Sequence, residues 1–143
     1  MKVLLDENVP RPLHHVLKTL LRDHDVDHVG EVWPGKKDIP LLADAGKKYD
    51  MFVTNDTHQY DSPEECRAIR SSRLHHVTYS LPVGGLDGLA LACGAICVGL
   101  RAAVLALDTV REQRIVRITS ISTSRQHCHI SDPGKEPPSP YWP

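Results

Sequence analysis

The sequence predicts one α/β domain, built as a three-layer α/β/α sandwich around a mostly parallel central sheet. Short β-prone runs alternate with longer amphipathic or apolar segments along most of the 143 residues. Parallel strands need crossover connections, and the helices in those connections cover both faces of the sheet. The length suits a single domain. We assign residues 1–131 to this domain and the proline-rich residues 132–143 to a C-terminal tail that is not expected to form helix or sheet.

The first half of the chain alternates strands with helices. Strands are predicted at residues 2–5, 25–29 and 50–54, and helices at 10–22 and 39–48. Pro10 and Pro12 suit a first helical turn, where a missing N–H costs nothing. Residues 31–37 contain Trp-Pro-Gly and predict a loop. Asp38 stands where an N-cap would precede the second helix.

The second half continues the same alternation. Ser62-Pro63-Glu64-Glu65 is typical of a capping box and predicts a helix that ends near residue 72. Alternating apolar residues predict strands at 74–80 and 114–120. The long stretch of small and apolar residues at 84–108 predicts a buried helix between them.

The composition indicates a soluble cytoplasmic protein with no membrane partner. Apolar residues make up 41% of the chain, and charges interrupt them, so we expect no run of the roughly 20 apolar residues that a membrane span needs. Asp6 and Glu7 come where a signal peptide would still need an apolar stretch. The four cysteines lack the spacing of a disulfide scaffold, and packing is favoured over metal binding for them.

Acidic residues follow the predicted strands at the points where those strands end. Asp6 and Glu7 come after the first strand, Asp56 comes after the third, and Asp38 begins the helix between them. Ligands of open parallel sheets bind at the carboxyl ends of the strands. Carboxylates that meet there repel one another unless a cation compensates. An all-oxygen ligand set favours Mg²⁺ or Mn²⁺.

Each of these acids also has a plain structural interpretation. Asp38 could be only an N-cap, Asp56 only a turn residue and Asp6 only the polar end of a strand. The net charge of −1 conceals an acidic first half and a basic second half. That asymmetry suits a metal site beside phosphate contacts, although chance surface charge can produce it too.

Three segments resemble the short PIN-like protein family. They are Val3-Leu4-Leu5-Asp6-Glu7-Asn8-Val9-Pro10, Asp38-Ile39-Pro40-Leu41-Leu42 and Phe52-Val53-Thr54-Asn55-Asp56. The resemblance covers roughly residues 1 to 60. Beyond that range it rests mainly on the order of the elements.

The resemblance implies a VapC-type, Mg²⁺-dependent endoribonuclease, often the toxin of a type II toxin-antitoxin pair. It places Asp6, Asp38 and Asp56 at the catalytic, metal-binding positions, with Glu7 as a further metal ligand. It also implies an RNA substrate, a cognate antitoxin protein and a homodimer. Relatives often carry a second acid two residues after the third motif, where this chain has His58.

Three further residues are candidates for auxiliary roles. Asn55 could bind a carboxylate or a substrate phosphate, although asparagine is also common in turns. His58 could carry a proton or ligate a metal, although surface histidine is the default. Asp87 could supply another acid at the same edge, and a helix cap is its plainer interpretation.

Two other functions remain open at this point. A catalytically silent PIN-like module that binds RNA or protein would explain the loss of an acid at the position of His58. Metal-dependent cleavage of DNA shares the chemistry of RNA cleavage, and the sequence does not choose between the two sugars.

Overall fold

The computed structural model describes residues 1–81, 83–119 and 135. In this part of the chain a five-stranded sheet has the order β2-β1-β3-β4-β5, and every neighbouring pair is parallel. Its strands are β1 (Lys2–Leu5), β2 (Asp25–His28), β3 (Met51–Thr54), β4 (His75–Thr78) and β5 (Ile115–Arg117). The predicted α/β sandwich is therefore confirmed.

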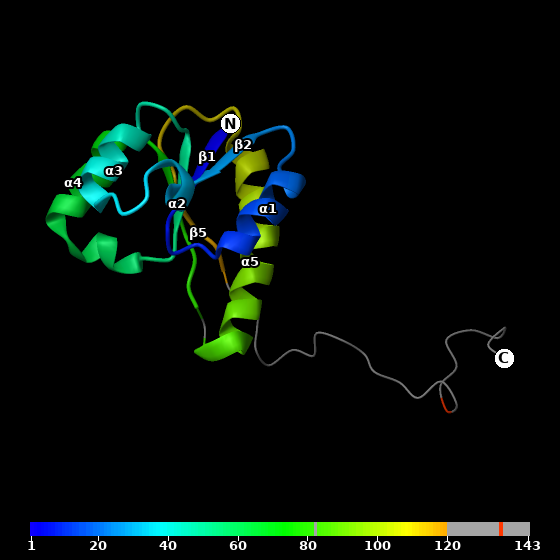
Figure 1. Ribbon diagram of the computed structural model, residues 1–143. Coiled ribbons are helices and arrows are strands. Elements are labelled where there is room, and N and C mark those ends of the chain that lie inside the picture. The colour runs from blue at the N-terminus through cyan, green and yellow to red at the C-terminus, as the bar shows by residue number, and fades with distance from the viewer. Residues whose placement is uncertain (82, 120–134, 136–143) are drawn as a thin grey trace.

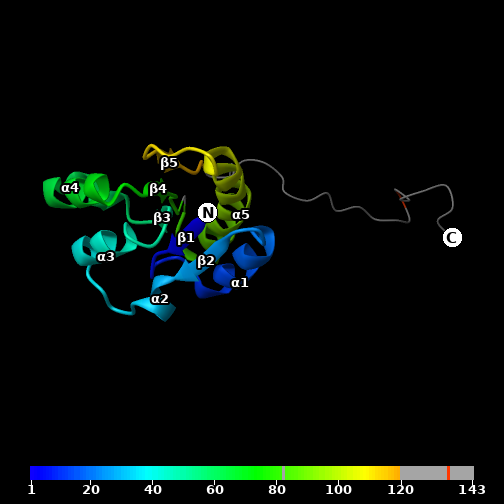
Figure 2. The ribbon, with the colours of Figure 1, turned by 90° about the horizontal axis from the view of Figure 1, so that it is seen from above.

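Helices cover the sheet on both faces, as Figures 1 and 2 show. They are α1 (Arg11–Leu20), α2 (Val29–Val32), α3 (Asp38–Ala45), α4 (Pro63–Ser72) and α5 (Gly85–Leu107), with a 3₁₀ turn η1 at Thr57–Asp61. The helices α1 and α5 lie on one face, and α3 and α4 lie on the other. Successive strand residues point to opposite faces. Val3 and Leu5 thus join the core beneath α1 and α5, whereas Leu4 joins the core beneath α3 and α4.

The strand order places a topological switch point between β1 and β3. In doubly wound sheets of this order, ligands bind in the crevice outside the carboxyl ends of the strands at that point. Residues that directly follow β1 and β3 are therefore the first to consider for a functional site.

Some local predictions were wrong. The predicted loop at 31–37 overlaps α2, and the turn η1 was not predicted. Asp38 is the first residue of α3 rather than its N-cap, which is Lys37 and forms no side-chain cap hydrogen bond. The predicted tail at 132–143 lies outside the described residues except for Lys135.

Helix α5 corrects the expectation that no segment is long and apolar enough to span a membrane. It has 23 residues and a mean hydropathy of 2.1 in its most apolar window, which suffices by length and composition alone. A mostly buried core helix passes the same test; α5 buries Ala92, Ile96 and Leu100 in the core beside α1, and 33% of its most apolar window is buried. Cys93 and Cys97 pack against that core, as favoured from the sequence.

Candidate active site at the carboxyl edge of the sheet

Asp6 is the buried acid at the centre of the carboxyl edge. It directly follows β1 and is only 7% exposed. Its backbone N–H donates to Val53 O at 2.9 Å, so the pairing with β3 extends to this residue. The backbone N–H of Glu7 donates to Oδ1 at 2.7 Å, and the hydroxyl of Thr54 donates to Oδ2 at 2.7 Å. These contacts fix the carboxylate in one orientation.

Thr54, the last residue of β3, connects the loops that follow the two central strands. Its side chain is fully buried. While its hydroxyl donates to Asp6, the same oxygen accepts hydrogen bonds from Asn8 Nδ2 and from the backbone N–H of Asp56, both at 3.0 Å. Asn8 Oδ1 accepts from the backbone N–H of Asn55 at 3.2 Å. From the sequence, a polar role for the Thr54 hydroxyl could not be distinguished from simple packing in a strand, so this residue was not among the predicted site residues.

The charges around Asp6 identify the acids that share its surroundings. Burial raises the pKa of Asp6 above its ordinary value, and the negative charges of Asp38 and Asp56 raise it further, against the opposing hydrogen bonds from Thr54 and Glu7. Both neighbouring acids are half-buried. Asp38 and Asp56, both predicted from the sequence, therefore lie near enough to Asp6 to act on it electrostatically.

Glu65 is a fourth acid at this edge and was not predicted. It lies in the first turn of α4, where its backbone N–H donates to the Ser62 hydroxyl at 3.3 Å. Partial burial raises the pKa of its carboxyl, and the charges of Asp38 and Asp56 raise it further. The sequence did contain a usable indication, because a helix that follows a strand of a parallel sheet begins near the carboxyl edge.

The purely structural role predicted as an alternative is confirmed for Asp56 but not for Asp38. Asp56 does cap the turn η1, since its Oδ1 accepts a hydrogen bond from the backbone N–H of His58 at 3.0 Å. Asp38 caps nothing, and in the described part of the chain its carboxylate accepts no hydrogen bond. A half-buried carboxylate without such a role is free to meet a ligand.

The side chains of three other candidates, Glu7, His58 and Asp87, are exposed. Glu7 is exposed, and its Oε1 accepts a hydrogen bond from the backbone N–H of Gly35 at 3.0 Å. The His58 side chain is 90% exposed and pairs with Asp61 at 3.1 Å. Asp87 is exposed in the first turn of α5. None of these three is among the charged groups that shift the pKa of Asp6, and their roles stay predictions.

The donor chemistry of the site fits a hard divalent cation. The charges of Asp38 and Asp56 act on both Asp6 and Glu65, and the pKa of the buried Asp6 is raised, which a cation would reverse. Among residues 1–81, 83–119 and 135, however, no three acidic, histidine or cysteine side chains stand close enough to hold an ion directly. Mg²⁺ is commonly bound through one or two carboxylates and several waters. Asp6 with Asp38 or Asp56 would suffice for such binding.

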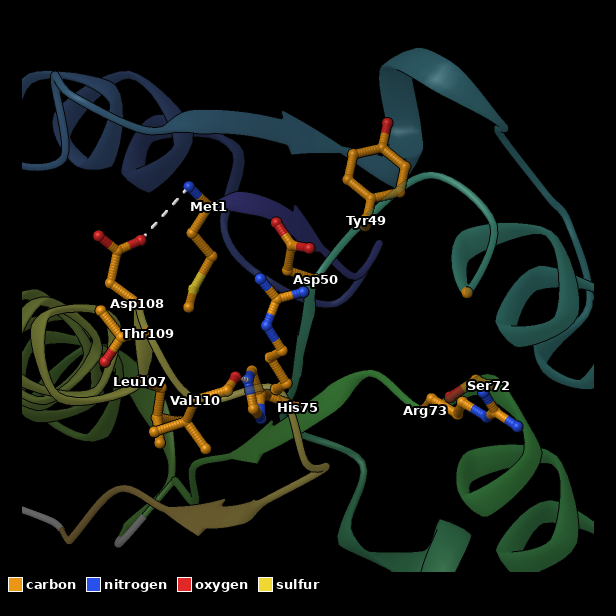
Figure 3. A pocket seen from close by; sticks show the side chains of 12 residues that line it. Met1, Tyr49, Asp50, Ser72, Arg73, His75, Leu107, Asp108, Thr109 and Val110 are labelled. Carbon is orange, nitrogen blue, oxygen red and sulfur yellow. Dashed lines mark hydrogen bonds and ion pairs between the residues drawn. The ribbon is translucent and has the colours of Figure 1, made fainter.

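A large cavity lies at the opposite, amino edge of the sheet (Figure 3). It has a volume of about 600 Å³ and includes Met1, Asp50 and His75, which begin or precede strands. Asp108 at the end of α5 pairs with the Met1 ammonium at 3.6 Å across one side of it. Because the acids lie at the other edge, this cavity is not the candidate active site.

Comparison with protein families gives a match over residues 1–80 to the family described as PIN like domain. The chain belongs to the PIN-like domain family. The matched residues run from β1 through β4 and include Asp6, Asp38, Asp56 and Glu65. The comparisons with curated proteins and with solved structures gave no match. The resemblance noted from the three sequence motifs is thus confirmed, and the PIN-like fold is of a nuclease type.

If these acids bind Mn²⁺, replacing Glu65 by glutamine is expected to change its affinity by about tenfold, the lower end of the usual cost for groups behind the metal ligands. The charge of Glu65 acts on the same acids as a bound cation would. The amount of bound Mn²⁺ can be measured by electron paramagnetic resonance. Glu64→Gln is the matched control, because Glu64 is the exposed neighbour on the same helical turn. Equal losses in the two variants would contradict a specific role for Glu65.

Proposed function

We propose that this PIN-like protein is a divalent-metal-dependent endoribonuclease. The observation that carries the proposal is the Asp6 carboxylate, which is buried at the switch point of the sheet. Its pKa is raised by that burial and by the charges of Asp38 and Asp56. A buried carboxylate beside other negative charges lowers the stability of a folded protein. Such a cost is typical of functional sites, where ionisable groups are held in perturbed environments.

A bound Mg²⁺ or Mn²⁺ would polarise the scissile phosphate and provide an activated water at neutral pH. The protein itself positions the carboxylates that attract the cation. Thr54 holds Asp6 in a fixed orientation, and the loop that carries Asp56 is tied to the same hydroxyl. Asp38 begins α3 with its carboxylate unengaged. No nucleophilic side chain is required for this chemistry.

The finer biological role that we propose is that of a toxin in a type II toxin-antitoxin pair, acting in the cytoplasm on RNA. Support for this role comes from family resemblance alone. A cognate antitoxin would be a protein that covers the acidic edge, and a homodimer is the expected assembly. An adjacent small reading frame that encodes a DNA-binding protein would support the pairing.

One observation favours a second function, a catalytically silent PIN-like module that binds RNA or protein. His58 stands where relatives often carry an acid, and its ring is exposed and paired with Asp61. An incomplete acidic site would bind a cation weakly and would not cleave.

The test is the cleavage of a mixed single-stranded RNA and of its DNA counterpart in Mg²⁺, Mn²⁺ or EDTA. We expect cleavage of the RNA that requires the metal and stops in EDTA. Equal cleavage of the DNA would broaden the activity to a general nuclease. The absence of cleavage with either metal, combined with retained RNA binding, would replace the nuclease by the silent module.

A further inference from the structure

A row of side chains crosses the carboxyl edge of the sheet from the acidic site to β5. Thr54 pairs in register with Thr78, and Thr78 pairs with Arg117. Residues paired in this way point to the same face of a sheet. Thr54 itself bonds to Asp6. The row therefore has a buried acid at one end, an arginine at the other and two threonines between them.

Thr78 carries a buried hydroxyl that lacks a partner. The residue is 1% exposed, and its Oγ1 forms no hydrogen bond within the described part of the chain. The Tyr60 hydroxyl is near enough for a weak side-chain hydrogen bond with Thr78, which opposes the rise that burial causes in the pKa of Tyr60, but the contact lacks the geometry of a full hydrogen bond. Tyr60 is engaged with His76 Nδ1 at 2.7 Å instead. An unsatisfied buried hydroxyl is costly, so its presence calls for a specific reason.

The reason that we consider is a ligand, because Thr78 lines a hollow of about 230 Å³ beside the acidic site. The other lining residues are Thr57, Tyr79, Ser80 and Arg117. Thr57, Ser80 and Arg117 are exposed hydrogen-bond donors, whereas the Tyr79 hydroxyl already donates to Asn8 O at 3.5 Å. No carboxylate is among the lining residues. The positive charge of Arg117 also acts on Tyr60, opposing the rise in pKa that burial causes there. Donors around one positive charge suit a phosphate group.

We propose that this hollow binds a backbone phosphate of single-stranded nucleic acid, at a distance from the phosphate that is cut. This inference rests on the proposed nuclease function and adds a subsite to it. Three strand spacings separate Asp6 on β1 from Arg117 on β5, or about 14 Å at the usual 4.7–4.9 Å per strand. At this backbone separation Arg117 is placed to hold a phosphate other than the one that a metal at Asp6 would bind.

The opposite charges at the two ends of the row would also orient the substrate. The uncompensated acids repel phosphates, whereas Arg117 attracts them. A strand held by Arg117 would lie along the carboxyl edge, with one of its other phosphates directed to the acidic site. The hollow is lined by Thr57 of η1, by residues 78–80 at the end of β4 and by Arg117 of β5. It therefore joins β5, which lies beyond the matched family segment, to β4 and η1 within it.

The test measures the binding of a fluorescein-labelled single-stranded oligoribonucleotide to the full chain in EDTA, across a range of salt concentrations. Arg117→Gln is expected to weaken binding about five- to tenfold and to reduce the salt dependence by roughly the 0.7 slope of one phosphate contact on a single strand. Thr78→Val, which keeps the shape of the side chain, is expected to weaken binding about two- to fivefold without changing that slope, since it removes a hydrogen-bond donor that carries no charge.

Arg111→Gln is the matched control, because Arg111 is exposed and lines the cavity at the opposite, amino edge. It removes the same charge and is expected to leave binding nearly unchanged. Equal affinities for Arg117→Gln and Arg111→Gln would overturn the proposal. If Arg117→Gln does not fold, replacing single phosphates of the RNA by neutral methylphosphonates tests the wild-type chain. One such linkage should weaken binding, and equal affinity for every linkage would overturn the subsite.

Cleavage by the wild-type chain, measured in parallel with Mn²⁺, separates this proposal from the proposed function. Arg117-dependent binding without any cleavage would retain the phosphate subsite and reject the nuclease. Cleavage with binding that is insensitive to Arg117 would retain the nuclease and reject the subsite.

Discussion

Asp6→Asn is expected to lower metal-dependent RNA cleavage by at least about a hundred-fold while the domain stays folded. Loss of an outer-shell partner of a metal site already lowers metal affinity or activity by about 10–100-fold. Loss of a direct carboxylate ligand should lower the activity at least as much. Asparagine has the size of aspartate, and its amide oxygen can keep one of the two hydrogen bonds that Asp6 accepts, for example that from the Glu7 backbone N–H. The measurement is the single-turnover rate on RNA with Mn²⁺ in excess, with circular dichroism as the check on folding.

Asp61→Asn provides the matched control for this prediction. Asp61 is an exposed acid at the end of η1 that pairs only with the exposed His58 among the described residues. It has the same charge and lies in the segment that follows Asp56. We expect its replacement to change the rate less than about twofold, since exposed ion pairs contribute little. Comparable losses in Asp6→Asn and Asp61→Asn would show that general negative charge, rather than a ligand, supports cleavage.

The strands and long helices were predictable because buried elements of this length show either a periodic pattern or a continuous run of apolar residues. Met51, Phe52 and Val53 form a continuous apolar run, as expected of a strand covered on both faces. The short elements α2 and η1 contain too few residues for a period to show. They depend on side-chain caps instead, from His28 to the N–H of Gly30 and from Asp56 to that of His58. Such caps form only when the chain around them is already in place.

The candidate site was predictable where topology alone decides it. Asp6 and Asp56 follow neighbouring parallel strands, and the carboxyl ends of such strands share one edge. Thr54 and Arg117 could not be assigned in this way, because their positions beside Asp6 and Thr78 depend on the register between strands. Register is set by the pairing of strands far apart in the chain. No local pattern reports it.

The second large effect concerns stability. Addition of Mn²⁺ at about a hundred times its dissociation constant is expected to stabilise the folded protein by about 2.7 kcal/mol. For a domain of this length that corresponds to a rise in melting temperature of about 10 °C. The rise should vanish in Asp6→Asn, because asparagine lacks the carboxylate that would bind the cation, and should persist in Asp61→Asn. Thermal unfolding followed by circular dichroism measures it without any need for activity.

The pH dependence of this effect follows from the raised pKa of Asp6, which burial causes first and the charges of Asp38 and Asp56 increase. The folded state holds the Asp6 proton more tightly than the unfolded state does. In EDTA, therefore, wild-type stability should fall relative to that of Asp6→Asn as the pH rises from about 4, the ordinary pKa of an aspartate, through the raised folded value. Above that value the carboxylate is ionised, and the increment from Mn²⁺ should be largest. An increment that stays constant from acidic to neutral pH would show that the stabilising cation binds elsewhere, because only ionisation of the buried acid creates the charge that it compensates.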